Sequence, residues 1–154
     1  MTLTAAPKRP AVAARRFGYV VTVLVNAALL YAANGWPGWE AVPFLTGDTR
    51  LVIGMVNASI VVNIAANLVY LPRDPSWLKA LGDMLTISVG FVALLRIWLV
   101  FPFDVGSGSF DWTLVVRIAL GVAMVGSAIG IVAAFVSFAK GMVARCSGRE
   151  VGRQ

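Results

Sequence analysis

The sequence contains no histidine, a single cysteine and few charged side chains, which make up 13% of its 154 residues. With Cys146 alone, the chain cannot form an internal disulfide, and a zinc site built from cysteine and histidine ligands is excluded. The lack of histidine also removes the side chain that most often serves as a general base in catalysis. We therefore expect no bound metal, no cofactor and no catalytic role.

Apolar segments take up most of the chain. Hydrophobic side chains make up 59% of the residues and the mean hydropathy is +0.83, whereas soluble domains are roughly one-half apolar and one-quarter charged. Because an α-helix rises about 1.5 Å per residue, about 20 apolar residues cross the hydrocarbon core of a bilayer. The sequence therefore predicts an all-α integral membrane protein with four spans, at residues 17–34, 51–71, 78–101 and 112–138.

The four spans and their connections form one predicted transmembrane domain over residues 15–140. Residues 1–14 are small and basic and contain two prolines, which is typical of a disordered arm. Residues 141–154 are basic and contain glycine, so we expect a flexible tail after the last span.

The positive side chains predict which ends of the helices face the cytoplasm. Ten of the thirteen lysines and arginines lie before the first span, at the turn between the second and third spans (Arg73 and Lys79), or after the fourth. By the positive-inside rule these segments are cytoplasmic, which predicts an antiparallel four-helix bundle in the cell membrane with both termini in the cytoplasm. We expect the net charge of +6 to meet anionic lipid headgroups, and we expect no nucleic-acid partner.

Polar side chains near the outer ends of the spans form a candidate anion site. This site consists of Arg50, Arg96, Arg117 and Asn57. An arginine inside a membrane must snorkel to the surface, pair with an acid or face a water-filled cavity. The alternative interpretation is therefore that the arginines reach the headgroups or the acidic residues Asp48, Asp104 and Asp111.

Deeper polar residues and a small-residue face are predicted to hold the helices together. Asn26 and Asn63 both lie near the midplane, so we expect an amide hydrogen bond between the first two spans. Asn67 and Asp83 lie towards the cytoplasm as an inner polar pair. Because Asp83 lies near Lys79 and a helix start, we expect it to be stabilised there without a function, and a proton-coupling role is the alternative. The close-packing face of the fourth span consists of Gly121, Gly126, Ser127 and Gly130.

Two functions are consistent with this pattern. The first is a non-catalytic subunit or stabilising partner of a larger membrane assembly, because the sequence offers no nucleophile with a base, no metal-ligand set and no large soluble domain. The second is a small oligomeric channel or transporter for an ion or a small anionic solute. For both functions we expect a homo-oligomer or a complex with another membrane protein.

Overall fold

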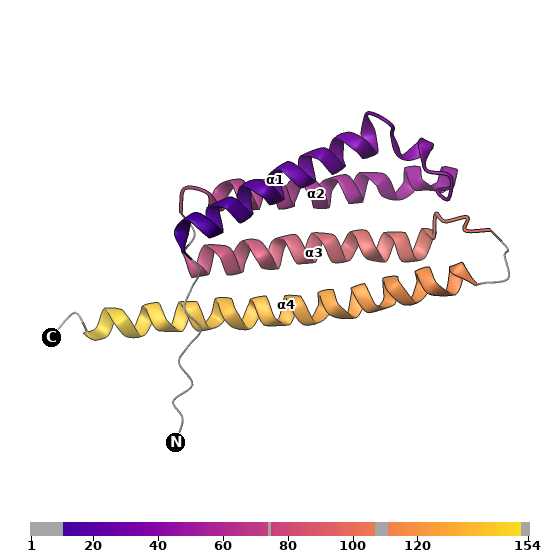
Figure 1. The fold of residues 1–154 in the computed structure, drawn as a ribbon. Coiled ribbons are helices and arrows are strands. Elements are labelled where there is room, and N and C mark those ends of the chain that lie inside the picture. Colours follow the sequence, from indigo (N-terminus) through magenta and orange to yellow (C-terminus); the bar gives the residue numbers. More distant parts are fainter. Residues whose placement is uncertain (1–10, 74, 107–110, 152–154) are drawn as a thin grey trace, which may run out of the picture.

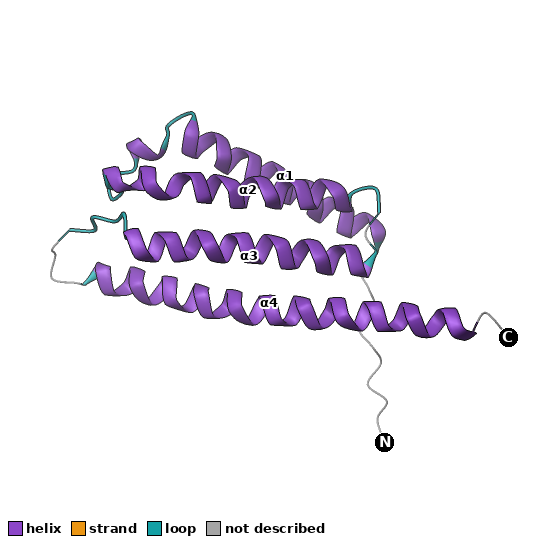
Figure 2. Cartoon of the chain, turned by 180° about the vertical axis from the view of Figure 1, so that it is seen from behind, coloured by secondary structure: helices purple, strands orange, loops and turns teal. Residues whose placement is uncertain are grey.

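The computed structural model describes residues 11–73, 75–106 and 111–151, with only the backbone described over 141–151. Within these ranges the chain is helical and contains no strand (Figure 2). The long helices are α1 (Val12–Asn34), α2 (Arg50–Tyr70), α3 (Ser76–Val100) and α4 (Trp112–Val151), and two short 3₁₀ helices are η1 (Trp39–Ala41) and η2 (Gly47–Thr49). Each long helix contains a segment long and apolar enough to cross a membrane, so the predicted all-α class is confirmed, with four helices of membrane-spanning length.

Two helices extend beyond their predicted limits. Helix α1 begins at Val12 rather than near residue 17, so Arg15 and Arg16 lie on the helix rather than before it. Helix α4 continues over residues 141–151, where the sequence predicted a flexible tail. Neither extension contains a proline, the residue that most strongly stops a helix. The rest of the predicted arm, residues 1–10, and the end of the tail, residues 152–154, lie outside the described residues.

The long helices pack side by side in chain order. Helix α1 contacts α2, α2 contacts α3, and α3 contacts α4. Helices α1 and α4 lie at opposite edges of this row, and α1 crosses α2 at an angle (Figures 1 and 2). The α1–α2 and α3–α4 connections lie at one end of the row and the α2–α3 turn lies at the other (Figure 1).

The end of α3 is determined by a buried proline. Phe101 adopts a left-handed backbone conformation with φ of 45°, and its N–H donates to the carbonyl of Ile97 at 2.8 Å. Pro102 follows and is fully buried. A proline has no N–H to donate and disfavours helical geometry in the residue before it, so the helix stops here.

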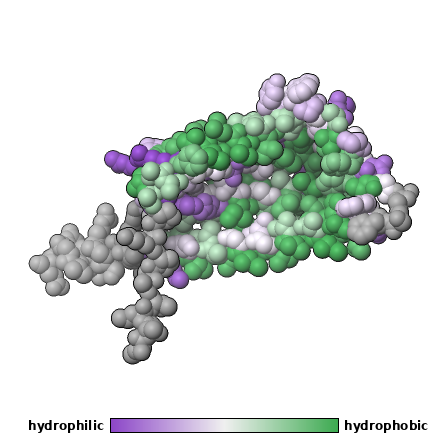
Figure 3. Space-filling model, viewed as in Figure 1, coloured by the Kyte–Doolittle hydropathy of each residue, from purple (hydrophilic) through white to green (hydrophobic). Residues whose placement is uncertain are grey.

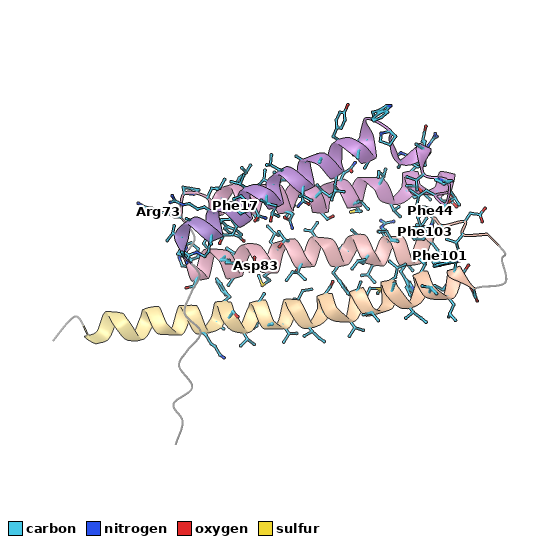
Figure 4. All side chains as sticks on the ribbon, viewed as in Figure 1. Phe17, Phe44, Arg73, Asp83, Phe101 and Phe103 are labelled. Atoms are coloured by element: carbon cyan, nitrogen blue, oxygen red, sulfur yellow. The ribbon has the colours of Figure 1, made fainter. Side chains whose placement is uncertain are left out.

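The two loops at this end of the row are joined to each other. Leu45 and Phe103 form an isolated antiparallel bridge, and the N–H of Asp104 donates to the carbonyl of Phe44 at 2.9 Å. Figure 4 places Phe44 and Phe103 close together at this end. We call residues 35–49 and 101–106 the loop cap, because together they cover the ends of α1, α2 and α3.

Few side chains are buried, and most of the surface is apolar. The most apolar window of each span has only 6% of its residues buried. In the described part of the chain, the buried side chains are Thr49, Val52, Tyr70, Ala80, Ala93, Pro102 and Ala134. Hydrophobic residues cover the middle of the visible face, and hydrophilic residues gather towards its two ends (Figure 3). An apolar surface of this extent fits a lipid environment.

Tyr70 of α2 packs tightly against α3 at Gly82. A Cβ atom built on Gly82 would overlap the hydroxyl of Tyr70. That hydroxyl donates to the carbonyl of Lys79 at 3.2 Å, and the Tyr70 ring packs against Tyr19 of α1 with 5.5 Å between ring centroids. Tyr70 therefore links α1, α2 and α3 near the α2–α3 turn.

We expect Gly82→Ala to lower the free energy of unfolding by about 1–3 kcal/mol, the usual cost of overpacking a close contact. Tyr70 would have to move and would lose its bond to Lys79. Gly90→Ala is the matched control, because a Cβ at Gly90 meets nothing within 4 Å, and alanine in a helix is favoured over glycine by about 0.5–1 kcal/mol. Thermal unfolding in detergent micelles measures both variants. Equal stabilities of the two variants would contradict the expectation.

Candidate functional site

A reciprocal amide pair joins α1 to α2. Nδ2 of Asn34 donates to Oδ1 of Asn57 at 2.9 Å, and Nδ2 of Asn57 donates to Oδ1 of Asn34 at 2.6 Å. The sequence grouped Asn57 with the outer arginines and missed Asn34, which ends the first span. The predicted topology could have indicated this pair, because the end of the first span and the first half of the second span lie towards the same end of the bundle.

The amides of Asn26 and Asn63 bond within their own helices. Nδ2 of Asn26 donates to the carbonyl of Thr22 at 2.9 Å. Asn63 accepts from Nδ2 of Asn67, at Oδ1 (2.9 Å) and at its carbonyl (2.8 Å). A carbonyl four residues earlier satisfies such an amide without any neighbouring helix. Within the described residues, the structure therefore does not bring together the amides of Asn26 and Asn63.

The carboxylate of Asp83 pairs with Lys79 rather than with Asn67. Nζ of Lys79 lies 2.8 Å from Oδ2 of Asp83, one turn along α3, and the two side chains are 44% and 40% exposed. Asp83 lies beyond the first turn of α3, where the helix dipole has little effect, so the ammonium group supplies the counter-charge. The pair lines a groove of about 390 Å³ between α3 and α4. Figure 4 places Asp83 towards the α2–α3 turn.

The three arginines of the predicted anion site have different surroundings. Arg50 is bonded to Glu40 of the loop cap, with 3.2 Å between Nη2 and Oε1. The guanidinium of Arg117 lies over the ring of Phe101, 4.8 Å from its centroid. Arg96 is exposed on α3, and among the described residues it makes no ion pair. These contacts do not by themselves assemble an anion site.

Two loop acids that were expected to pair with the arginines have other partners. Oδ1 of Asp111 accepts from the N–H of Leu114 at 2.9 Å and so caps the start of α4. Oδ1 of Asp104 accepts from the N–H of Gly106 at 3.3 Å, within its own turn. Arg117 makes a cation–π contact with an aromatic ring instead of pairing with an acid.

The predicted packing face of α4 points in more than one direction. A Cβ on Gly130 would lie 3.4 Å from Ile87 of α3, and a Cβ on Gly121 would lie 4.0 Å from the ring of Trp98, which is also on α3. A Cβ on Gly126 would meet nothing within 4 Å. The hydroxyl of Ser127 donates to a carbonyl of its own helix at 2.8 Å. Gly121 and Gly130 thus serve the α3–α4 contact, whereas Gly126 is open.

The side of α4 turned away from α3 carries a regular apolar stripe, which we call the α4 seam. It consists of Ile118, Val122, Val125, Ile129, Val132 and Val136, each between 43% and 68% exposed. The spacing alternates between four and three residues, as in helices that pack side by side with interlocking side chains. At about 100° per residue, the buried Ala134 lies on the opposite side of α4 from Ile118.

Neither a metal centre nor a known relative identifies a function. Within the described ranges, no three histidine, cysteine, aspartate or glutamate side chains lie close enough together to hold a metal ion. The chain matches no protein-family model, no curated protein and no solved structure. A function must therefore be argued from the contacts of the chain itself.

We expect Asn57→Leu to lower the free energy of unfolding by about 0.6–2 kcal/mol, because it removes both amide bonds between α1 and α2 and leaves Nδ2 of Asn34 only its bond to the carbonyl of Leu30. Asn26→Leu is the control, since Asn26 bonds only within α1. A double-mutant cycle measured by unfolding in micelles should give a coupling energy for Asn34→Leu with Asn57→Leu and none for Asn26→Leu with Asn57→Leu. Purely additive effects in the first cycle would show that the pair does not hold α1 to α2.

Proposed function

We propose that the chain is a non-catalytic multi-pass membrane protein that acts by association, as a subunit or stabilising partner of a membrane assembly. The observation that carries the proposal is the open edge of the helix row. Among the described helices, α4 packs chiefly against α3, and the α4 seam faces away from that contact. A transmembrane helix of another chain is the occupant that fits this edge.

The composition of the α4 seam favours a helix as its partner. In a bilayer, apolar character alone does not bring helices together, because lipid tails are equally apolar, and close packing supplies the attraction. The seam consists of valine and isoleucine, whose branched side chains are already restricted to few rotamers in a helix. They therefore lose little conformational entropy when a second helix packs on them. Gly126, open at the margin of the seam, allows a close approach of the backbones.

The alternative function, an oligomeric channel or transporter, draws less support from the contacts. A conducting path needs polar groups that are free to face it. The amides of Asn26, Asn63 and Asn67 are instead bonded within their own helices. Arg50 is paired with Glu40, which removes one positive charge from the proposed anion site.

Our proposal includes the orientation of the helices. We place both termini and the α2–α3 turn in the cytoplasm, with antiparallel helices in the cell membrane and the loop cap on the outer side. Ten of the thirteen positive side chains support this orientation by the positive-inside rule, Arg73 and Lys79 near the α2–α3 turn among them. The turn lies at the end of the row opposite the loop cap (Figure 1).

Cys146, the single cysteine, reports the orientation directly. In intact cells we expect a membrane-impermeant maleimide to leave Cys146 unlabelled, and permeabilisation should allow the reaction. The matched control is Cys146→Ser combined with Gly47→Cys, because a Cβ at Gly47 in the loop cap meets nothing within 4 Å. This variant should be labelled in intact cells. The reverse pattern of labelling would overturn the proposed orientation.

For the association, we expect the wild-type chain to migrate in mild-detergent extracts well above its own 16.4 kDa. Val122→Ala with Ile129→Ala removes packing from the α4 seam, and a loss of about 1.4 kcal/mol weakens association about tenfold. Val61→Ala on α2, where Val61 is 49% exposed, is the control and should leave the complex unchanged.

The partner can be identified by crosslinking. Val125→Cys in a Cys146→Ser background should form a disulfide-linked dimer if the partner is a second copy of the chain. A bifunctional maleimide–amine reagent at the same position should instead capture a different chain if the complex is heteromeric. A wild-type chain that is monomeric in native extracts, with no co-purifying chain, would overturn the proposal.

A further inference from the structure

A groove between α3 and α4 carries one side chain of each charge. Its volume is about 390 Å³, and it lies towards the α2–α3 turn, where Figure 4 places Asp83. Lys79 and Asp83 line this groove with 2.8 Å between Nζ and Oδ2, and the two side chains are 44% and 40% exposed. Ser76 and Ser137 line it as well. Both charges are therefore accessible to a molecule that enters the groove.

The ion pair keeps hydrogen-bonding capacity for such a molecule. An ammonium group carries several N–H donors, and a carboxylate offers about four acceptor sites. Nζ of Lys79 donates to Asp83 and lies over the ring of Tyr70, 5.8 Å from its centroid. These two contacts hold the ammonium group in place, and its exposed side can bond to a ligand.

The lining of the groove changes from polar to apolar along the helices. Ser76 begins the apolar span of α3, and Ser137 lies close to Lys140, where the span of α4 ends. Ile87 and Gly130 also line the groove, about 15 Å further from these ends by the helical rise, which is about half the thickness of a hydrocarbon core. In a bilayer the groove would thus reach from the headgroup level to the middle of the acyl chains.

This pattern restricts the occupant to an amphiphile with two opposite charges. An anionic headgroup would bond to Lys79 but would bring a second negative charge next to Asp83, and a cationic headgroup would oppose Lys79 in the same way. A phosphate and an ammonium group joined by a short link can form charge-assisted hydrogen bonds with both side chains. The apolar inner part of the groove fits an acyl chain.

We infer that the groove binds a phospholipid with a phosphoethanolamine headgroup. Its phosphate accepts from Nζ of Lys79, its ammonium group donates to the carboxylate of Asp83, and one acyl chain lies along Ile87 and Gly130. A phosphocholine headgroup has no N–H with which to bond to Asp83. The α4 seam lies on the side of α4 turned away from α3, so lipid binding and the proposed association can be lost separately.

The test measures lipid binding to the full chain in detergent by native mass spectrometry, with dioleoyl lipids that differ only in their headgroups. We expect the wild-type chain to bind phosphatidylethanolamine about five- to tenfold more tightly than phosphatidylcholine or phosphatidylglycerol, because only the first forms charge-assisted bonds to both Lys79 and Asp83. Glycerophosphoethanolamine, the same headgroup without acyl chains, should not compete at the same concentration. Equal binding of the three lipids, or competition by glycerophosphoethanolamine, would overturn the inference.

Asp83→Asn keeps the shape of the side chain and removes its charge. It should lower the affinity for phosphatidylethanolamine to that for phosphatidylcholine and raise the affinity for phosphatidylglycerol, because Lys79 then meets an anion without a competing carboxylate. Arg73→Gln is the matched control, since Arg73 is exposed near the same turn but does not line the groove, and it should keep the wild-type preference. A uniform loss of all three lipids in Asp83→Asn would show a merely structural role for Asp83 and would contradict the inference.

Ser137→Trp tests whether the lipid occupies the groove itself. The hydroxyl of Ser137 donates to the carbonyl of Ala133 in its own helix at 2.8 Å, so its loss breaks no bond between helices. The indole ring would fill the polar end of the groove and should abolish the preference for phosphatidylethanolamine, with thermal unfolding unchanged. A preference that survives in Ser137→Trp would place the lipid elsewhere on the surface and refute the proposed site.

Discussion

A polar group inside a bilayer must find its hydrogen-bond partner within the protein, and this constraint determines how the helices are held. Most hydroxyl groups of the spans satisfy it locally, by donating to a carbonyl of their own helix, as in Thr22, Thr86, Ser88, Ser127 and Ser137. Such bonds contribute nothing to the contact between helices. Side-chain bonds that cross between helices are found towards the two ends of the row, at Asn34 with Asn57 and at Tyr70 with Lys79. Polar contacts therefore tie the ends, and van der Waals packing holds the middle.

The contacts between the helices depend on small residues. Ala80, Ala93 and Ala134 are among the few buried side chains, and Gly130 faces Ile87 across the α3–α4 contact. Small side chains let backbones approach but bury little area, so each helix keeps most of its surface free. In lipid, the stability of this arrangement depends on how closely the facing surfaces of neighbouring helices fit together. An edge helix with one packed side and one regular unpacked side is therefore the part of the fold most suited to a second chain.

The span positions were predictable because hydropathy and proline placement act locally. The ends of α2 and α3 fall within two residues of the predicted limits, and Pro72, Pro75 and Pro102 account for three of the four. The start of α1 and the end of α4 differ from the predicted limits, because a helix continues past its apolar segment where no residue stops it. For the site residues, the hydrogen-bond partners in the structure differ from the expected ones: Asn57 bonds to Asn34, and Asp83 pairs with Lys79. Sequence periodicity gives the direction of a side chain on its own helix, whereas the choice between an amide neighbour and a carbonyl four residues earlier depends on packing.

The loop cap brings together the groups that the sequence left scattered. It contains Glu40, which pairs with Arg50, and Phe101, which receives the guanidinium of Arg117. It also covers an apolar cavity of about 340 Å³, whose wall comes mostly from α1, α2 and α3. The loop cap therefore holds the ends of α1, α2 and α3 next to one another, and α4 joins the row through its contact with α3. The order of the helices at this end thus depends on the contacts of two loops as well as on the packing of the spans.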